Sequence, residues 1–337
     1  MKRHPLWALV IGAAGSLALA VIPPAGAAPD ESVITSAVFF GDSLTDAGTY
    51  GFRFTTNPGR TWAQHVAGTL GQPDTPNEHV ASYDDVYQGK PGIPGPGGLN
   101  YAEGGARAEL PYSVVSKNPQ GTPISAGIQV QRYLAEHATF APGQLVTLWV
   151  GTNDVALNFD PRFGKSLADD LRADRAPTRE KMDAERARVR QAAAAEARTA
   201  STILRHGAQH LLVFTLFDLG VLPWFETPAA RDYVNDLTAA YNAALLDQLP
   251  KDPRLQIFDT NAFVTDLLTD PARYGFTHGA NEDACAQPGQ DYCDADTLKE
   301  AGADRTYVFA AAEHFTTHAH ELLAERVQQQ MGVRPKP

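Results

Sequence analysis

Short apolar runs alternate with longer amphipathic segments along most of the chain. The apolar runs are rich in β-branched and aromatic residues and predict buried strands at 33–41, 99–102, 144–151, 210–217 and 254–259. The longer segments carry apolar residues at helical spacing and predict helices at 59–71, 126–138, 178–205, 230–249 and 317–330. Continuous apolar strands that alternate with helices are typical of a parallel sheet covered on both faces. We therefore expect an α/β protein with a central parallel sheet.

Polar motifs follow three of the predicted strands. Ser43 comes directly after the first strand, Gly104-Gly105 follows the second, and the sequence Thr-Asn-Asp at 152–154 follows the third. In open α/β sheets, functional groups lie just beyond the carboxyl ends of the strands. The pattern thus predicts that these three motifs converge at one edge of the sheet.

Residues 1–28 have the pattern of a secretory signal peptide. Lys2 and Arg3 give a positive start, an apolar run follows, and small residues near the end of the segment suit cleavage. The alternative is an uncleaved membrane anchor, since about 17 apolar residues reach the lower limit for a spanning helix. We expect export to the periplasm or the cell exterior, with 29–337 as a single domain and no membrane segment after cleavage.

Charge and cysteine usage agree with export. Cleavage would remove two cations and change the formal net charge from −11 to −13, and such an acidic protein has little attraction to nucleic acid or anionic lipid. The two cysteines, Cys285 and Cys293, flank a Pro-Gly turn and predict a disulfide, with two free thiols as the alternative. They lie in a predicted loop at 278–296, and a Pro/Gly-rich stretch at 84–98 predicts a second long loop.

Four residues make a candidate site for acyl transfer. A serine hydroxyl becomes a nucleophile when a base takes its proton, and His314, in a predicted loop before the last helix, is the candidate base for Ser43. Such a site also needs donors aimed at the oxyanion. Gly105 offers a backbone N–H, Asn153 offers a side-chain amide, and the N–H of Ser43 is a third donor. Each residue also has a purely structural alternative as a helix cap, a turn or a buried polar group.

Four sequence blocks carry these residues in a fixed order. They are FFGDSLTDAG at 39–48, NYAEGGA at 100–106, VGTND at 150–154 and EHFTTHAH at 313–320. Together they resemble the GDSL family of the SGNH hydrolases, which are serine esterases and lipases. The resemblance implies Ser43 as the nucleophile and His314 as the base, with Gly105 and Asn153 in the oxyanion hole. It also implies a three-layer, flavodoxin-like α/β/α domain that needs no metal or organic cofactor.

The last block departs from the family's usual Asp-x-x-His-Pro pattern. Ala311 stands where the aspartate is expected, and Phe315 replaces the proline after His314. The aspartate normally holds the imidazole in one tautomer and stabilises the imidazolium. Four explanations are open. A backbone carbonyl orients the imidazole, another acid such as Glu313 or Asp304 replaces the aspartate, a water or small anion occupies the space beside the alanine, or the enzyme is impaired.

Other polar residues have simpler interpretations. His314 and His318 are four residues apart, but no HExxH pattern accompanies them, so we expect no metal site. We expect His318 to be a solvated residue in the first turn of the last helix. Asp42 and Asp154 are predicted to hold the turns beside them, and the charged stretch 172–198 is predicted to be a solvated helix face.

The sequence therefore predicts an exported serine ester hydrolase that degrades a small-molecule or lipid ester. One alternative is a catalytically impaired or inactive protein of the same fold that only binds its ligand. A carbohydrate deacetylase is another alternative. We expect a monomer without a nucleic-acid partner.

Overall fold

Four parallel strands form the central sheet of the structure, a computed structural model that describes residues 33–80, 90–109, 121–159, 165–287 and 289–335. They are β1 (Ser36–Gly41), β4 (Gln144–Trp149), β5 (His210–Phe214) and β6 (Leu255–Phe258), in the spatial order β1-β4-β5-β6. The parallel register places Gly41 opposite Trp149, so β1 and β4 end side by side. The α/β class and the parallel sheet predicted from the alternating pattern are confirmed.

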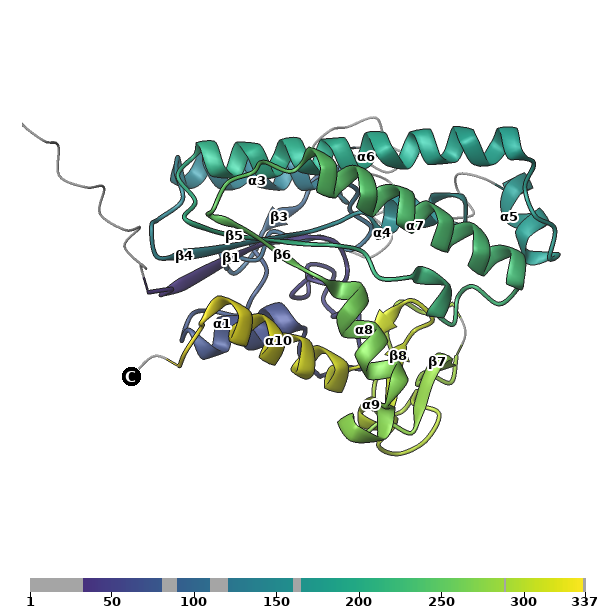
Figure 1. Ribbon diagram of the computed structural model, residues 1–337. Coiled ribbons are helices and arrows are strands. Elements are labelled where there is room, and N and C mark those ends of the chain that lie inside the picture. The colour runs from purple at the N-terminus through teal and green to yellow at the C-terminus, as the bar shows by residue number, and fades with distance from the viewer. Residues whose placement is uncertain (1–32, 81–89, 110–120, 160–164, 288, 336–337) are drawn as a thin grey trace, which may run out of the picture. The chain divides into compact units, whose positions relative to one another are not determined.

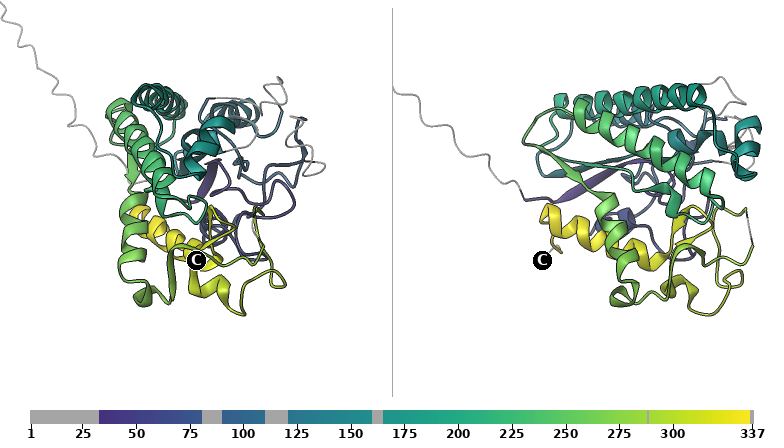
Figure 2. Two further views of the ribbon diagram at one scale, coloured as in Figure 1. Left: turned by 90° about the vertical axis from the view of Figure 1, so that its right-hand side faces the viewer. Right: turned by 45° about the vertical axis from the view of Figure 1, so that its right-hand side comes forward.

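Helices cover both faces of this sheet and produce three layers (Figure 1). One face is covered by α1 (Trp62–Thr69) and α10 (Thr317–Met331), and the other by α3 (Ala126–His137), α6 (Arg179–Arg205) and α7 (Pro228–Gln248). The turned views of Figure 2 show the same separation of the two helical layers. The predicted three-layer arrangement is thus confirmed, and all five predicted helices are present.

Polar residues fix where the main helices begin. Side chains at the residues before α3, α6, α7 and α10 each accept a hydrogen bond from a backbone N–H in the first turn; they are Ser125, Thr178, Thr227 and Thr316. Pro228 occupies the first position of α7, where no intrahelical N–H bond is needed. The last of these caps matters for the site, because α10 starts directly after His314 and its neighbours.

Shorter elements surround the carboxyl ends of the strands. The short helices are α4 (Thr152–Val155), α5 (Lys165–Arg172), α8 (Thr260–Thr269) and α9 (Ala303–Thr306). Single 3-10 turns are η1 (Ala156–Phe159), η2 (Leu219–Val221) and η3 (Pro271–Tyr274). β2 (Glu78–His79) pairs with β3 (Ile93–Pro94), and β7 (His278–Asp283), β8 (Tyr307–Ala310) and β9 (His314–Phe315) form a third small sheet.

The predicted strand at 99–102 is reduced to a single bridge. Only Asn100 pairs with β1, at Phe39, although the main chain on both sides of it also bonds to Phe39. The side chain of Asn100 accepts a hydrogen bond from the Ala102 N–H at 3.1 Å, which turns the chain away from the sheet. The prediction was wrong about a full strand because this local bond competes with the ladder.

Three predicted loops contain strands. The stretch 278–296 begins with β7, whose polar sequence HGANED is held to β8 by main-chain bonds rather than by an apolar face. His314 was expected in a loop but lies in β9, which pairs with β8. In the other predicted loop, residues 84–89 lie outside the described residues and β3 occupies part of the rest.

Residues Val33–Pro337 form one compact unit. The predicted signal peptide at 1–28 lies outside the described residues. Among the helices that the structure describes, none is both long and apolar enough to cross a membrane.

Candidate active site

Ser43 lies at the tip of a tight turn that begins where β1 ends. The N–H groups of Thr45 and Asp46 both donate to the Asp42 carbonyl at 3.0 Å and close the turn. The preceding Gly41 allows close packing against β4, because a Cβ at this position would lie 2.4 Å from a main-chain oxygen of that strand. The Gly-Asp-Ser sequence thus ends a buried strand and presents Ser43 at the edge of the sheet.

Two buried aspartates hold this turn. Asp42 accepts a hydrogen bond from the Leu44 N–H at 3.1 Å, as predicted for a residue that supports the turn. Asp46 accepts hydrogen bonds from the N–H groups of Gly48 at 2.7 Å and Gly104 at 2.9 Å. Burial raises the pKa of Asp42 to about 7 and that of Asp46 to about 6. The bond to Gly104 joins the nucleophile turn to the loop that carries the predicted oxyanion donor.

His314 faces the Ser43 hydroxyl. Its Nε2 lies 2.9 Å from Ser43 Oγ, and the two residues are 3% and 9% exposed. The ring of Phe54 packs against the imidazole with the centroids 5.1 Å apart. Burial lowers the pKa of His314 to about 3, so the imidazole is neutral at pH 7 and can accept a proton. The structure therefore brings the predicted nucleophile and base together.

Burial is the main cause of the low imidazole pKa of His314, and an interaction with the Asp291 backbone opposes it. The buried Nδ1 has no hydrogen-bond partner of standard geometry among the described residues. A proton on Nδ1 leaves Nε2 as an acceptor, which is the tautomer that a general base needs.

Ala311 offers the imidazole no carboxylate. It is buried with a φ of 52°, and its N–H donates to Cys285 Sγ at 3.2 Å. The nearby Asp283 supports the turn, since it accepts from the Ala312 N–H at 2.8 Å. Of the four explanations for the missing aspartate, the interaction with the Asp291 backbone supports the backbone carbonyl.

The loop that faces the imidazole is closed by a disulfide. As the sequence predicts, Cys285 and Cys293 are bonded, with their Cα atoms 5.6 Å apart. The Cys293 carbonyl accepts a hydrogen bond from the Asn57 N–H at 2.6 Å. The ring of Tyr292 stacks on that of Phe52 with the centroids 4.3 Å apart. These contacts hold the loop against the segment 52–57. The same segment contains Phe54, whose ring packs against the imidazole of His314.

The loops that carry the predicted oxyanion donors are joined to one another. Asn153 follows β4, and its Nδ2 donates to the Ala106 carbonyl at 3.0 Å. Gly105 has a φ of 81°, a conformation that favours glycine, and packs against Pro123. Within the described part of the chain, the N–H groups of Ser43 and Gly105 donate to no acceptor, so both can bind a ligand oxygen.

A buried tyrosine supports the loop after β4. A Cβ added to Gly151 would lie 2.5 Å from the Tyr241 ring, so only glycine fits at this contact. The Tyr241 hydroxyl donates to Glu196 at 2.6 Å, and burial raises the pKa of Glu196 well above its usual range. This pair fixes the main chain immediately before Asn153.

Most of the chain matches one protein family. The sequence profile described as GDSL-like Lipase/Acylhydrolase matches residues 38–327. The chain belongs to this family. Family membership makes the protein a GDSL-like hydrolase, and it explains why the four sequence blocks occur in this order.

Two relatives are similar to this GDSL-like hydrolase over most of its length. A phosphatidylcholine-sterol acyltransferase of Aeromonas hydrophila is 25% identical over 316 residues, which cover 91% of this chain and 82% of that protein. A protein of Pseudomonas putida, described as an uncharacterized protein in the trpE-trpG intergenic region, is 29% identical over 295 residues. The match covers 83% of this chain but spans less than half, 44%, of that longer relative.

Solved structures with a similar fold are more distant in sequence. An acetylxylan esterase from Geobacillus stearothermophilus has 15% identity and a TM-score of 0.39, covering 90% of this chain and 99% of that one. A lipase/acylhydrolase from Enterococcus faecalis has 15% identity and a TM-score of 0.38, covering 90% and 98% of the two chains.

Two sequence expectations for this GDSL-like hydrolase need correction. His318 is not merely solvated, because its Nε2 contacts the Tyr274 carbonyl at 2.8 Å and its Nδ1 contacts Glu321 at 3.0 Å. The charged stretch 172–198 is not solvated throughout, since Arg188 donates to the main-chain carbonyl of Asp154. In the described part of the chain, no three His, Cys, Asp or Glu side chains converge as metal ligands do.

Some residues of the site carry no signal in the sequence of the GDSL-like hydrolase. Asp291 contributes a main-chain carbonyl, which any residue type supplies. Gln129 on α3 binds the end of β1 through both ends of its amide, at 2.8 and 2.9 Å from Gly41, but its spacing only marks it as a helix residue. Asp154 was predicted to hold the turn beside it, but its carboxylate accepts the Ala108 N–H at 2.9 Å and so supports the loop after Gly105 instead.

Proposed function

We propose that this GDSL-like hydrolase is an exported carboxylic-ester hydrolase that works with a Ser43–His314 dyad. The observation that carries the proposal is the 2.9 Å contact between His314 Nε2 and Ser43 Oγ at the end of a buried strand. Family membership supports hydrolysis as the reaction, and the neutral imidazole supports a base that can act at pH 7. The dyad replaces the usual triad because Ala311 stands at the position of the acid.

The reaction proceeds through an acyl-enzyme. Ser43 Oγ attacks the ester carbonyl carbon while its proton moves to His314 Nε2, and the carbonyl oxygen becomes an oxyanion. The N–H groups of Ser43 and Gly105 and the amide of Asn153 stabilise that oxyanion. His314 then gives its proton to the leaving alcohol, and the C–O bond to the alcohol breaks. A water molecule next attacks the acyl carbon and gives a proton to His314 Nε2. The bond between the acyl carbon and Ser43 Oγ then breaks, His314 returns the proton to Oγ, and the acid is released.

We further propose that the Asp291 carbonyl orients His314 throughout this cycle. The carbonyl holds the proton on Nδ1, so that Nε2 remains the acceptor for the serine proton. A carbonyl supplies orientation and a partial negative charge, whereas a carboxylate supplies a full one. We therefore expect turnover that is slower than that of a triad enzyme but well above the rate in water.

The substrate class in this proposal is a small-molecule or lipid ester. The name of the Aeromonas relative, an acyltransferase, supports acyl transfer from a lipid as the reaction that this chain resembles. Release of the acyl group to water distinguishes a hydrolase from an acyltransferase. Hydrolysis of acetylated carbohydrate and binding without turnover are the competing functions, and the experiment below separates them.

The test combines active-site labelling with a substrate panel. Purified mature protein is treated with a fluorophosphonate probe, and the labelled peptide is identified by mass spectrometry. We expect labelling at Ser43, none in Ser43→Ala, and much slower labelling in His314→Gln. The panel compares p-nitrophenyl esters of increasing chain length, a lysophospholipid and an acetylated xylooligosaccharide, with and without an alcohol acceptor. Absence of labelling and of turnover on every ester would favour the inactive binding protein.

Export is tested separately from catalysis. We expect the full chain expressed in a bacterium to be recovered outside the cytoplasm, with an N-terminus created by cleavage near residue 28. Protein that stays attached to the membrane with residue 1 intact would instead support the anchor.

A further inference from the structure

The peptide between Gly104 and Gly105 carries one of the proposed oxyanion donors. The Gly105 N–H belongs to the same peptide unit as the Gly104 carbonyl, and the trans bond points the two groups in opposite directions. Because neither residue has a Cβ, both signs of φ are open to them, and this peptide can rotate more readily than one between larger residues. Rotation by half a turn would direct the carbonyl oxygen toward the oxyanion and the N–H away from it. The donor therefore depends on a contact that holds the peptide in one orientation.

Tyr50 binds the carbonyl end of this peptide. Its hydroxyl donates to the Gly104 carbonyl at 2.8 Å, and the residue is only 8% exposed. The ring also occupies the space beside Gly104, because an added Cβ would lie 2.9 Å from the Tyr50 ring and 2.1 Å from that of Phe54. With the carbonyl bound on the Tyr50 side, the Gly105 N–H is directed to the opposite side of the peptide.

The Tyr50 ring is itself held by aromatic neighbours. It lies edge-on to Phe54, with the centroids 5.7 Å apart, and its centroid is 6.3 Å from that of Phe52. The other contact of Phe54 is with the imidazole of His314, at 5.1 Å between the centroids. The position of the Tyr50 hydroxyl is thus set by the same aromatic group that contacts the proposed base.

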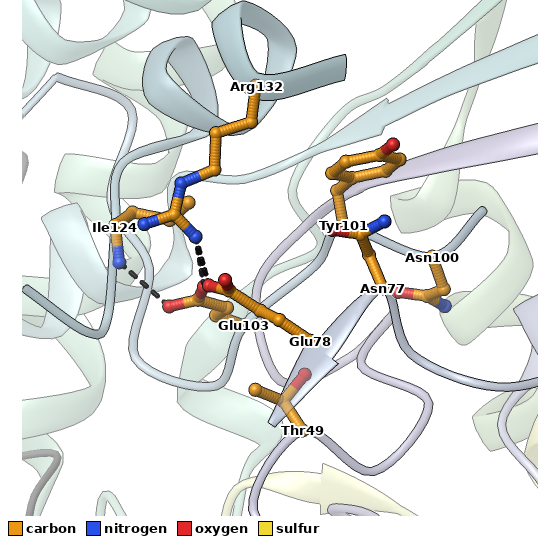
Figure 3. A pocket seen from close by; sticks show the side chains of 8 residues that line it. All are labelled: Thr49, Asn77, Glu78, Asn100, Tyr101, Glu103, Ile124 and Arg132. Carbon is orange, nitrogen blue, oxygen red and sulfur yellow. Dashed lines mark hydrogen bonds and ion pairs between the residues drawn. The ribbon is translucent and has the colours of Figure 1, made fainter. Parts of the chain in front are cut away.

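Other bonds fasten the loop on both sides of the Gly-Gly peptide. Before it, Glu103 Oε2 accepts a hydrogen bond from the Ile124 N–H at 2.9 Å, as Figure 3 shows. After it, the Ala106 carbonyl accepts from Asn153 Nδ2 at 3.0 Å. Neither bond involves the C=O or the N–H of the Gly-Gly peptide, so neither fixes its orientation. That bond comes from Tyr50.

We infer that the Tyr50 hydroxyl fixes the Gly104–Gly105 peptide so that the Gly105 N–H faces the oxyanion. The inference rests on the proposed function, because it assigns Tyr50 a role through an oxyanion donor. Tyr50 is a positioning residue, which acts through the peptide rather than on the substrate. A hydrogen bond to the carbonyl also polarises the peptide, and this makes its N–H a stronger donor.

The test compares Tyr50→Phe with Tyr133→Phe in the full mature enzyme. Tyr50→Phe keeps the ring and removes the donor to Gly104. Tyr133→Phe is the matched control, because Tyr133 is also buried and its hydroxyl donates to Gln144 Oε1 at 2.7 Å. Gln144 is the first residue of β4, so this bond lies at the opposite end of the sheet from Ser43. Steady-state kinetics on p-nitrophenyl acetate give kcat and KM separately, and circular dichroism shows that each variant is folded.

We expect Tyr50→Phe to lower kcat about 10- to 100-fold and to leave KM within about threefold, because the donor acts on charge that develops in the transition state. The ratio kcat/KM should fall by the same factor as kcat. Tyr133→Phe should keep the wild-type kcat. A wild-type kcat in Tyr50→Phe, a fall confined to KM, or an equal fall of kcat in Tyr133→Phe would overturn the inference while the proposed function stands.

A third variant separates the donor from the shape of the side chain. Tyr50→p-aminophenylalanine keeps an N–H donor at the same end of the ring, although a weaker one than the phenol. Its kcat should lie about three- to fivefold below that of the wild type and above that of Tyr50→Phe. If Tyr50→Phe does not fold, this variant replaces it, and a wild-type kcat in it would then overturn the inference.

Hydrogen exchange tests the same peptide without catalysis. Release of the Gly104 carbonyl lets the loop open more often, so the amides of 104–106 should exchange faster in Tyr50→Phe than in the wild type and in Tyr133→Phe. If the wild type neither hydrolyses esters nor takes the fluorophosphonate probe at Ser43, the proposed function fails, and exchange alone decides whether Tyr50 holds the peptide. Equal exchange in all three proteins would overturn the inference.

Discussion

Opening the Cys285–Cys293 disulfide is expected to lower turnover while the protein stays folded. The perturbation is the double substitution Cys285→Ser and Cys293→Ser, or reduction of the wild type. The disulfide closes the loop that carries Asp291, whose carbonyl is proposed to orient His314. Freed from the cross-link, this loop gains conformations in which the carbonyl no longer holds the imidazole. We therefore expect a larger effect on kcat than on the stability of the fold.

The magnitudes of the two effects can be estimated separately. The bonded cysteines are eight residues apart, and a loop of this size contributes about 2–3 kcal/mol through the entropy of the unfolded chain. That loss lowers the melting midpoint by several degrees in a protein of this size. A hydrogen bond to a group that becomes charged contributes about 1.5–3 kcal/mol, which is the upper limit for the proposed Asp291–His314 interaction. Its loss at the imidazole corresponds to a fall in kcat of at most about 10- to 100-fold.

The assay is hydrolysis of p-nitrophenyl acetate well below the melting midpoint of the variant. Thiol titration confirms that reduction opened the bond, and circular dichroism confirms that the variant is folded. The serine variant serves as the control for reductant, which should lower the rate of the wild type only. A folded variant with the wild-type kcat would refute the argument that this loop orients His314.

Four further predictions concern single positions or pH. Gly105→Ala should lower kcat by about 100-fold in steady-state assays, because a φ of 81° is strained for alanine and the donor moves. The low pKa of His314, about 3, should keep kcat/KM high down to about pH 5; a fall centred near pH 6.5 in the profile would contradict it. Gly151→Ala should lower stability by about 1–3 kcal/mol in urea unfolding, since its Cβ meets the Tyr241 ring. Ala311→Asp should raise kcat less than about tenfold, because the Asp291 carbonyl is proposed to orient the imidazole already; a gain of about 100-fold would show that the acid was missing.

The central sheet and the position of the nucleophile could be predicted from the sequence because burial dictates both. All six residues of β4 are buried, and both faces of its sequence QLVTLW carry large apolar side chains, so the strand stands out. Ser43 and Asn153 follow such strands directly, and parallel strands bring their carboxyl ends together. The edge strand β6 could also be predicted, because its apolar run is short and has polar residues on both sides. Its Ile257 is nevertheless 40% exposed.

The third small sheet and the orientation of the imidazole could not be predicted in this way. β7 has the polar sequence HGANED and is held by main-chain bonds, so no period of apolar residues marks it. The group proposed to orient His314 is the main-chain carbonyl of Asp291, and every residue type has such a group. The disulfide and the Tyr292–Phe52 contact hold the loop that carries it.

Because the proposed dyad lacks a carboxylate, its activity should depend strongly on the proposed oxyanion donors. Lowering the His314 pKa from 6.5 to about 3 corresponds to about 5 kcal/mol against forming the imidazolium. Proton transfer from Ser43 creates the imidazolium together with an oxyanion. Two opposite charges about 4 Å apart attract by about 4 kcal/mol at the effective dielectric constant near a protein surface. The oxyanion can therefore offset most of the penalty, but only if Gly105 holds it close to the imidazolium. The contacts that position Gly105, including its packing against Pro123, should therefore limit turnover more strongly here than in an enzyme that has the third acid.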